Sequence, residues 1–160
     1  MEITESAIIQ DPVRATQVIE SLKAWDVRVA MDDFGTGYTS LAFLQKLPID
    51  ILKIDRSFVT PMLGDCDSTA IVRAILSLAE ALGMETIAEG IESEKLALAL
   101  ASLGCSHGQG FHLGRPLPAR EMTALLHAQR SLAQARADEP PPAPPERPVG
   151  PPPWYEPAHE

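Results

Sequence analysis

Short apolar runs alternate with longer amphipathic segments along most of the chain. The apolar runs lie at residues 27–31, 49–54, 85–88 and, less clearly, 108–111, and residues 1–4 resemble the end of another run. Apolar runs of this length, bounded by turn residues, predict buried strands. Because amphipathic segments separate the runs, we expect strands that alternate with helices, and hence a parallel sheet.

The amphipathic segments carry signals for helix starts and stops. Asp11 is a suitable cap for a helix that begins at Pro12. The apolar positions expected on the inner face of that helix are Val13, Val18, Ile19 and Leu22. Ser68 is a suitable cap for a second helix, which Gly83 ends. Further helices are predicted at residues 40–46, 93–103 and 118–129.

Residues able to bind a metal or a phosphate follow one predicted strand after another. They are Glu2, Asp32 with Asp33, Lys53, Glu89 and Gln109. A doubly wound sheet gathers its ligands mainly at one switch point, whereas a (β/α)8 barrel gathers side chains from many strand ends onto one face. The pattern therefore favours a barrel. A full barrel takes roughly 250 residues, so we predict a partial TIM-like barrel of about five strand–helix units.

The composition narrows the classes of partner and location. The chain has 160 residues and a formal net charge of -9, from 22 acidic residues against 13 Lys and Arg. This charge and the lack of a basic run argue against nucleic acid or an anionic membrane surface as a partner. No apolar stretch has the length of a membrane helix, and the first residues lack the features of a signal peptide. We therefore expect a cytoplasmic protein.

The last part of the sequence differs from the rest. Ten of the 15 prolines lie between residues 140 and 160. Such a segment forms neither a helix nor a sheet ladder. We therefore predict a folded domain over residues 1–130 and a disordered, Pro-rich tail over residues 131–160. The tail could offer a polyproline ligand to a partner, and a solvated tail without a partner is the alternative.

Asp32 and Asp33 are the strongest candidates for a metal site. They follow an apolar strand and precede the glycine-rich sequence 35–37. Adjacent carboxylates repel each other, and a cation between them relieves the repulsion. The alternative is a pair of solvated turn carboxylates. The buried character of the preceding strand favours a divalent-metal site.

Three further residues stand in unusual sequence surroundings. Lys53 lies inside an apolar strand, and a lysine is rarely buried unless it is paired. Among carboxylates it would stay charged and could hold a phosphate or orient a water; otherwise it reaches solvent. Glu89 precedes a glycine that permits a tight turn at a strand end. Gln109 lies between two glycines, which indicates that another group approaches the backbone closely there.

Five segments resemble, in order and spacing, the EAL-domain family of phosphodiesterases, which hydrolyse the bacterial second messenger cyclic di-GMP. The segments are residues 2–6, 32–38, 47–55, 88–92 and 104–116. The resemblance covers about residues 1–118 and implies a modified TIM barrel.

The resemblance also implies a role for each candidate residue. Glu2, Asp32 and Asp33 match metal ligands, and Glu89 matches a metal- or water-associated glutamate. Lys53 matches a lysine near the attacking water, Gln109 matches a glutamine near the site, and Glu5 matches a glutamate that braces the loop after Asp33. The implied reaction is two-metal hydrolysis of cyclic di-GMP to linear pGpG, with Mg²⁺ or Mn²⁺ as the ions. The implied partners are cyclic di-GMP, a second copy in a homodimer, and an upstream sensor or GGDEF-type domain.

The Glu-Ala-Leu sequence that gives the family its name is missing at the expected place. The match begins at the third metal-binding strand, and residues 80–82, which spell these letters, lie within a predicted helix. We therefore expect a truncated domain that is inactive in isolation. One alternative is a degenerate module that binds cyclic di-GMP or a protein without turnover. Another is an unrelated metal barrel in which Lys53 acts as a base.

Overall fold

The computed structural model of the chain describes residues 1–37 and 40–137, with side chains as far as residue 131. The chain divides into two compact units, Met1–Pro116 and Leu117–Glu160. The second unit is described through its helix α7 (Ala119–Ala137). Among the described residues, no helix combines the length and the apolar character needed to cross a membrane.

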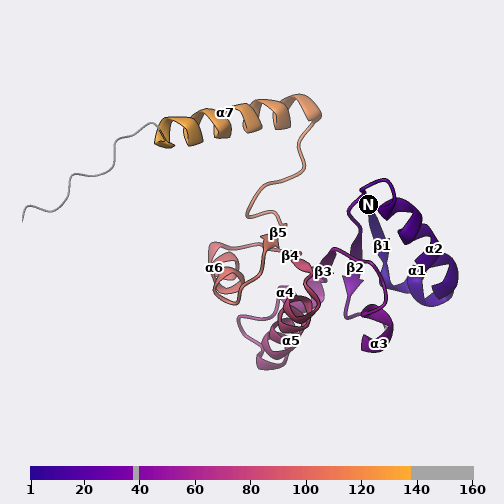
Figure 1. Cartoon of the computed structure of the whole chain (residues 1–160). Helices are drawn as coiled ribbons and strands as arrows, with labels where there is room; N and C mark the ends of the chain where they lie inside the picture. Colours follow the sequence, from indigo (N-terminus) through magenta and orange to yellow (C-terminus); the bar gives the residue numbers. More distant parts are fainter. Residues whose placement is uncertain (38–39, 138–160) are drawn as a thin grey trace, which may run out of the picture. The chain divides into compact units, whose positions relative to one another are not determined.

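The first unit is built on a five-stranded parallel sheet (Figure 1). Its strands are β1 (Glu2–Thr4), β2 (Ala30–Phe34), β3 (Ile51–Ile54), β4 (Glu85–Ala88) and β5 (His107–Gly108). The strands lie in the order β1-β2-β3-β4-β5, so each pairs with its neighbour in the chain. A doubly wound sheet reverses its strand order at a switch point. The uninterrupted order in this sheet is that of a barrel arc.

Helices connect the strands. Helices α1 (Glu5–Gln10) and α2 (Pro12–Lys23) follow β1, and α3 (Leu41–Leu44) follows β2. Helices α4 (Arg56–Val59) and α5 (Cys66–Leu82) follow β3, and α6 (Glu94–Ser102) follows β4 (Figure 1). Each of these helices begins at a side-chain oxygen that accepts a backbone N–H of the first turn. Such caps satisfy amide donors that have no partner within the helix.

The two faces of the sheet differ in the side chains that they carry. Met31 pairs with Leu52, and Leu52 with Thr86, and these three residues are buried on one face. The residues of the opposite parity include the buried Ala30 and Lys53. Side chains alternate between the faces of a sheet, so the first face is the one that packs against the helices. The other face corresponds to the inside of a barrel and carries the charged groups.

The inner face of helix α2 agrees only in part with the sequence prediction, since Ile19 is buried and Leu22 packs against the core, as predicted. The helix begins at Pro12 and is capped by Asp11, as predicted. Its buried residues are Ala15 and Ile19, whereas Val13 and Val18 are 69% and 44% exposed. Ala15 and Ile19 are four residues apart and share a stripe. Val13 and Val18 lie outside this stripe, so their assignment to the core was wrong.

Other helices and strands begin or end at residues that differ from the predicted ones. Asp65, not Ser68, caps helix α5, and Ser68 bonds to Asp65 from within the first turn. Strand β2 covers Ala30–Phe34 instead of residues 27–31 and so includes both aspartates. Helix α7 continues to Ala137, into the segment assigned to the tail. The Pro-rich residues 140–160 lie outside the described part of the chain.

Asp50 links the segments that lead into strands β2 and β3. Its carboxylate accepts the backbone N–H of Val29 at 2.7 Å and the Lys23 ammonium at 2.6 Å. Partial burial acts to raise the pKa of Asp50. The hydrogen bonds from Lys23 and Val29, with the positive charges of Lys23 and Arg28, outweigh this effect and hold the pKa below its usual value. The ionised form is therefore the one that stabilises the fold.

We expect the Asp50→Asn variant to lose about 2 kcal/mol of unfolding free energy at pH 7, since hydrogen bonds to charged groups contribute about this much. A lowered folded-state pKa gives stability that is present above the unfolded pKa of about 3.9 and is lost as pH falls through the folded value. The difference between the proteins should therefore shrink below about pH 4. Urea unfolding at pH 7, 5 and 3 measures it, with the exposed Asp26→Asn as control. A difference that is independent of pH would contradict the prediction.

Candidate active site

Lys53 lies at the centre of a cluster of carboxylates. It belongs to β3 and is 4% exposed. Its Nζ lies 2.7 Å from Glu89 Oε1, 2.8 Å from Asp32 Oδ1 and 3.1 Å from Glu2 Oε1. The alternative of a lysine that reaches solvent is therefore wrong. Three strands, β1, β2 and β3, and the residue after β4 bring these four side chains together.

The surroundings of Lys53 keep it charged. Burial by itself disfavours the ammonium form and acts to lower the pKa. The hydrogen bonds to Asp32, Glu89 and Glu2, together with the negative charge of Glu89, outweigh burial and hold the pKa of Lys53 above its usual value. A neutral lysine that acts as a base does not fit this environment.

Asp32 and Asp33 lie on the same side of the sheet because strand β2 is irregular. In a regular strand, successive side chains point to opposite faces. The pairing of β2 with β3 shifts between Met31 and Phe34, where three steps on β2 oppose two on β3. At the same point, Asp33 has a φ of 55°, in the left-handed region. The extra residue and this backbone turn bring the second carboxylate toward the first.

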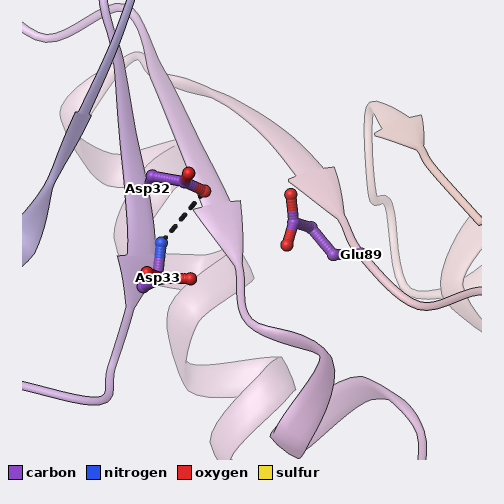
Figure 2. Close-up of side chains that lie close together, drawn as sticks. All are labelled: Asp32, Asp33 and Glu89. Atoms are coloured by element: carbon purple, nitrogen blue, oxygen red, sulfur yellow. Dashed lines mark hydrogen bonds between the residues drawn. The ribbon is translucent and has the colours of Figure 1, made fainter.

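Asp32, Asp33 and Glu89 form a cluster that could hold a metal ion (Figure 2). One carboxylate oxygen from each lies within 4.8 Å of the others. In Figure 2, the Glu89 carboxylate points toward the two aspartates from the far side of the intervening strand. Asp33 is exposed, and Asp32 and Glu89 are half-buried. Carboxylate oxygens are the ligands that hard divalent cations prefer, so these residues fit a cation of that class.

Glu2 lies beside this group of three. Its side chain is 56% exposed and contacts the cluster through the ion pair with Lys53. The structure therefore brings Glu2, Asp32, Asp33, Lys53 and Glu89 into one site, as the strand-end pattern predicted.

Glu5 supports the loop after β2. It is 2% exposed, and its Oε2 accepts the backbone N–H groups of Gly35 and Gly37, each at 3.1 Å. A Cβ atom added at Gly37 would lie 2.7 Å from the Glu5 carboxyl carbon. Gly35 has a φ of 98°, which favours glycine, and packs against the Phe58 ring. Tyr38, which ends this motif, lies outside the described residues.

Gln109 follows β5, and its surroundings explain the two flanking glycines. Its backbone N–H donates to the Ala88 carbonyl at 2.8 Å, and its carbonyl accepts the Ile91 N–H at 3.1 Å. A Cβ atom at Gly110 would lie 2.2 Å from the Ile91 carbonyl oxygen, and one at Gly108 would lie 2.5 Å from the Ile91 side chain. The predicted close approach is confirmed, and the approaching group is Ile91.

Two features were not predicted from the sequence. One is the irregularity of β2, and the other is the packing of Phe58, from helix α4, against Gly35 in the loop after β2. The paired aspartates are a weak signal for the first of these. Phe58, whose ring lies 3.0 Å from a Cβ atom built on Gly35, gave no signal because its packing partner is distant in the sequence.

The family of the chain follows from a match that covers this whole unit. The model of the EAL domain matches residues 1–116. The chain belongs to the EAL-domain family. Its strands therefore form part of a TIM-type barrel, as predicted, and an unrelated metal barrel is excluded.

The relatives of this EAL chain include signalling proteins of known activity. It is 44% identical over 126 residues to the bifunctional diguanylate cyclase/cyclic di-GMP phosphodiesterase MucR of Pseudomonas aeruginosa, with 79% of this chain and 18% of MucR covered. The structure of the MucR phosphodiesterase in complex with c-di-GMP is 45% identical, with a TM-score of 0.73 over 76% of this chain and 49% of that one. The manganese/cy-diGMP complex of Klebsiella pneumoniae BlrP1 is 32% identical, with a TM-score of 0.64 over 69% of this chain and 28% of that one.

These alignments cover only part of each relative. The chain spans about half of the solved MucR phosphodiesterase and less than a fifth of the full MucR protein. The EAL family is metal-dependent, and the carboxylate cluster of this chain agrees with that property.

Proposed function

We propose that the chain is the part of a cyclic di-GMP phosphodiesterase domain that supplies Asp32, Asp33, Glu89, Glu2 and Lys53 to a two-metal site. The observation that carries the proposal is the convergence of four carboxylates and a buried lysine on one face of an EAL-type sheet. Cyclic di-GMP is the ligand of the MucR and BlrP1 complexes. A phosphodiesterase of this kind would act in the cytoplasm.

The described residues divide the chemistry between them. Asp32, Asp33 and Glu89 would hold Mg²⁺ or Mn²⁺, with Glu2 at the edge of the site. Such ions lower the pKa of a bound water and offset charge on a phosphoryl group. Lys53 provides a fixed positive charge beside the same carboxylates, where it would attract a phosphate oxygen or hold the attacking water. Water would attack phosphorus, the bond between phosphorus and one ribose 3′ oxygen would break, and this oxygen would take up a proton as the water loses one, which gives linear pGpG.

Glu5 and Gln109 have supporting roles in this proposal. Glu5 positions the loop that follows Asp33 through the amides of Gly35 and Gly37. Gln109 lies at the same end of the sheet as Glu89 and would contact the substrate. We expect the isolated 160-residue chain to lack hydrolysis, since it spans only about half of the solved MucR phosphodiesterase. Mg²⁺-dependent release of pGpG by the purified chain would contradict this expectation.

Metal binding can be measured without turnover. We expect Mn²⁺ to bind to the purified chain, and the Asp33→Asn variant to weaken binding at least about tenfold, because it removes one charged ligand. Titration calorimetry or the electron paramagnetic resonance signal of free Mn²⁺ measures the affinity. Asp26→Asn, an exposed aspartate away from the cluster, is the matched control. Equal affinity of the two variants would contradict the assignment of Asp33.

A second candidate function is binding without turnover. It is favoured by the combination of an ordered charged site with a chain that covers only part of an EAL domain. Calorimetry with cyclic di-GMP in the presence of Ca²⁺ separates the two candidates. Binding by the isolated chain supports a binding module, and the absence of binding leaves only the role as part of a larger enzyme.

A further inference from the structure

A cavity lies between helices α5 and α6, on the face of the sheet that packs against the helices. Its volume is about 510 Å³, within the range of about 300 to 1,000 Å³ that is usual for small-molecule sites. Helix α5, the start of strand β4 and the segment between α6 and β5 supply its walls. The carboxylate cluster around Lys53 lies on the other face of the sheet. The cavity is therefore separate from the candidate active site.

The floor of the cavity is polar where the rest of the sheet is apolar. Thr86 of β4 continues the row of Met31 and Leu52 on the helix-covered face, but it carries a hydroxyl group. It is 3% exposed, and its Oγ1 accepts the backbone N–H of Ser106 at 3.1 Å. Strands that are covered by helices in a parallel sheet are normally apolar. The hydroxyl at this position is therefore not explained by packing alone.

Several hydroxyl groups of the cavity have spare hydrogen-bonding capacity. The hydroxyls of Thr86 and Ser106 are 3.5 Å apart, which is longer than a usual O–H···O bond. The other acceptor near Thr86 Oγ1 is the Cys105 sulfur at 3.6 Å, and sulfur accepts weakly. Within the described part of the chain, Ser77 forms no side-chain hydrogen bond, whereas Ser102 donates to a carbonyl of its own helix. A bound molecule could therefore bond to these groups.

The cavity has opposite charges at its two ends. Arg73 and Glu80 both line it, with Ser77 between them. They are seven residues apart on α5, so they share one face of the helix and lie about 10.5 Å apart along its axis. Neither forms an ion pair with another described residue. The carboxyl ends of α5 and α6 also border the cavity, at Met84 and Leu103, and add partial negative charge.

These groups fit a ligand with three features. A guanidinium such as that of Arg73 binds phosphate through parallel N–H groups. The Glu80 carboxylate only accepts hydrogen bonds, so it suits an edge that presents two N–H donors. The hydroxyls between them suit a sugar. Guanine has N1–H and N2–H donors side by side on its Watson–Crick edge, whereas adenine and cytosine have an acceptor beside their amino group.

We propose that the cavity between α5 and α6 binds a guanine mononucleotide, with its phosphate at Arg73, its ribose at the hydroxyl groups and its base edge at Glu80. Leu76 and Leu103 supply the apolar surface against which the base packs. Because the sheet separates this site from the carboxylate cluster, binding requires no metal ion. The inference goes beyond the proposed function and does not depend on it.

The first experiment measures affinity and its chemical basis. GMP is titrated calorimetrically into the full 160-residue chain in the presence of EDTA. We expect one GMP per chain, with a Kd below about 1 mM. Guanosine lacks the phosphate and inosine monophosphate lacks the 2-amino group, so each should bind at least about tenfold more weakly, because a charged group of the site then loses its partner. The lack of saturable GMP binding, or equal affinity for the three compounds, would overturn the proposal.

The second experiment assigns the two ends of the ligand. Arg73→Met should remove most of the difference in affinity between GMP and guanosine, and Glu80→Gln most of the difference between GMP and inosine monophosphate. Both positions are exposed, and circular dichroism checks that each variant keeps the wild-type helix content. Arg14→Met and Glu20→Gln, at exposed positions of α2, are the matched controls and should change both differences less than about twofold. Differences that persist in the Arg73 and Glu80 variants would overturn the assignment.

The third experiment locates the ligand. Addition of GMP should shift the amide NMR signals of Ser77, Thr86 and Ser106. Shifts at Asp33 instead would place the nucleotide at the carboxylate cluster and overturn the proposal. Ser77→Phe fills the cavity and should reduce GMP affinity at least about tenfold, since a bulky side chain takes the place of the ligand. Ala74→Phe, at an exposed position of the same helix, is its control, and equal effects of the two would also overturn the proposal. The Mn²⁺ titration of the carboxylate cluster is independent of all these outcomes.

Discussion

Replacing Lys53 with methionine is expected to lower the free energy of unfolding by about 3 kcal/mol at pH 7, the usual cost of removing one partner from a buried charge cluster. The ammonium of Lys53 lies within 3.1 Å of Glu2, Asp32 and Glu89. Methionine fills a similar volume and removes the charge, so the carboxylates then face one another without a counterion. Urea or thermal unfolding in metal-free buffer measures the loss.

Two comparisons make the Lys53 prediction specific. Lys46→Met removes a charge at an exposed position and should change stability by less than about 0.5 kcal/mol. Because the folded state holds the pKa of Lys53 above its ordinary value, the deficit of Lys53→Met should be fully present up to about pH 10, the ordinary pKa of a lysine, and should shrink only above it. A loss that equals that of Lys46→Met would show that Lys53 does not hold the cluster together.

Replacing Glu5 with alanine is expected to cost about 3 kcal/mol, because it leaves two backbone donors without their acceptor and opens a buried site. The donors are the amides of Gly35 and Gly37, both bonded to the same carboxylate oxygen. The loop that contains them follows directly from Asp33. We therefore expect the amides of both glycines to exchange with solvent about 10- to 100-fold faster in the variant, as the loop opens locally.

Glu5→Gln tests whether the loop needs a hydrogen-bond acceptor at this position or a negative charge. Its amide oxygen can still accept these N–H groups, so the variant should regain more than half of the stability that alanine loses. Glu20→Ala, at an exposed position of α2, is the control, because it also replaces a helical glutamate with alanine but removes no buried contact. Hydrogen exchange followed by NMR or mass spectrometry gives the local effect. Unchanged exchange at Gly35 and Gly37 in Glu5→Ala would contradict the bracing role.

Features determined by local chemistry were predictable from the sequence. Strand β4, the cap Asp11 and helix α6 lie where the pattern placed them, because apolar runs, proline and capping residues act over a few positions. The site residues Asp32, Lys53 and Glu89 were also predictable. Polar groups that follow apolar runs in a parallel sheet all lie at the same edge, so their convergence follows from topology.

Features determined by packing between distant segments were not predictable. Helix α1 is only six residues long and has too few turns for a periodic pattern. The orientation of α2 depends on which of its apolar residues, Ala15 or Val18, meets the sheet, and both choices fit the composition. The irregularity between Met31 and Phe34 arises from the register with β3, which a single segment of sequence does not contain.

Because every strand pairs with its neighbour in the chain, the sheet can grow by one strand at a time during synthesis. Each new strand finds the edge of the previous one already formed, and the intervening helices keep the paired residues close in the sequence. Proteins with such local contacts fold faster than those that must first join distant segments, and N-terminal elements fold first as the chain emerges. An arc of a barrel can therefore reach its fold before the ring is closed.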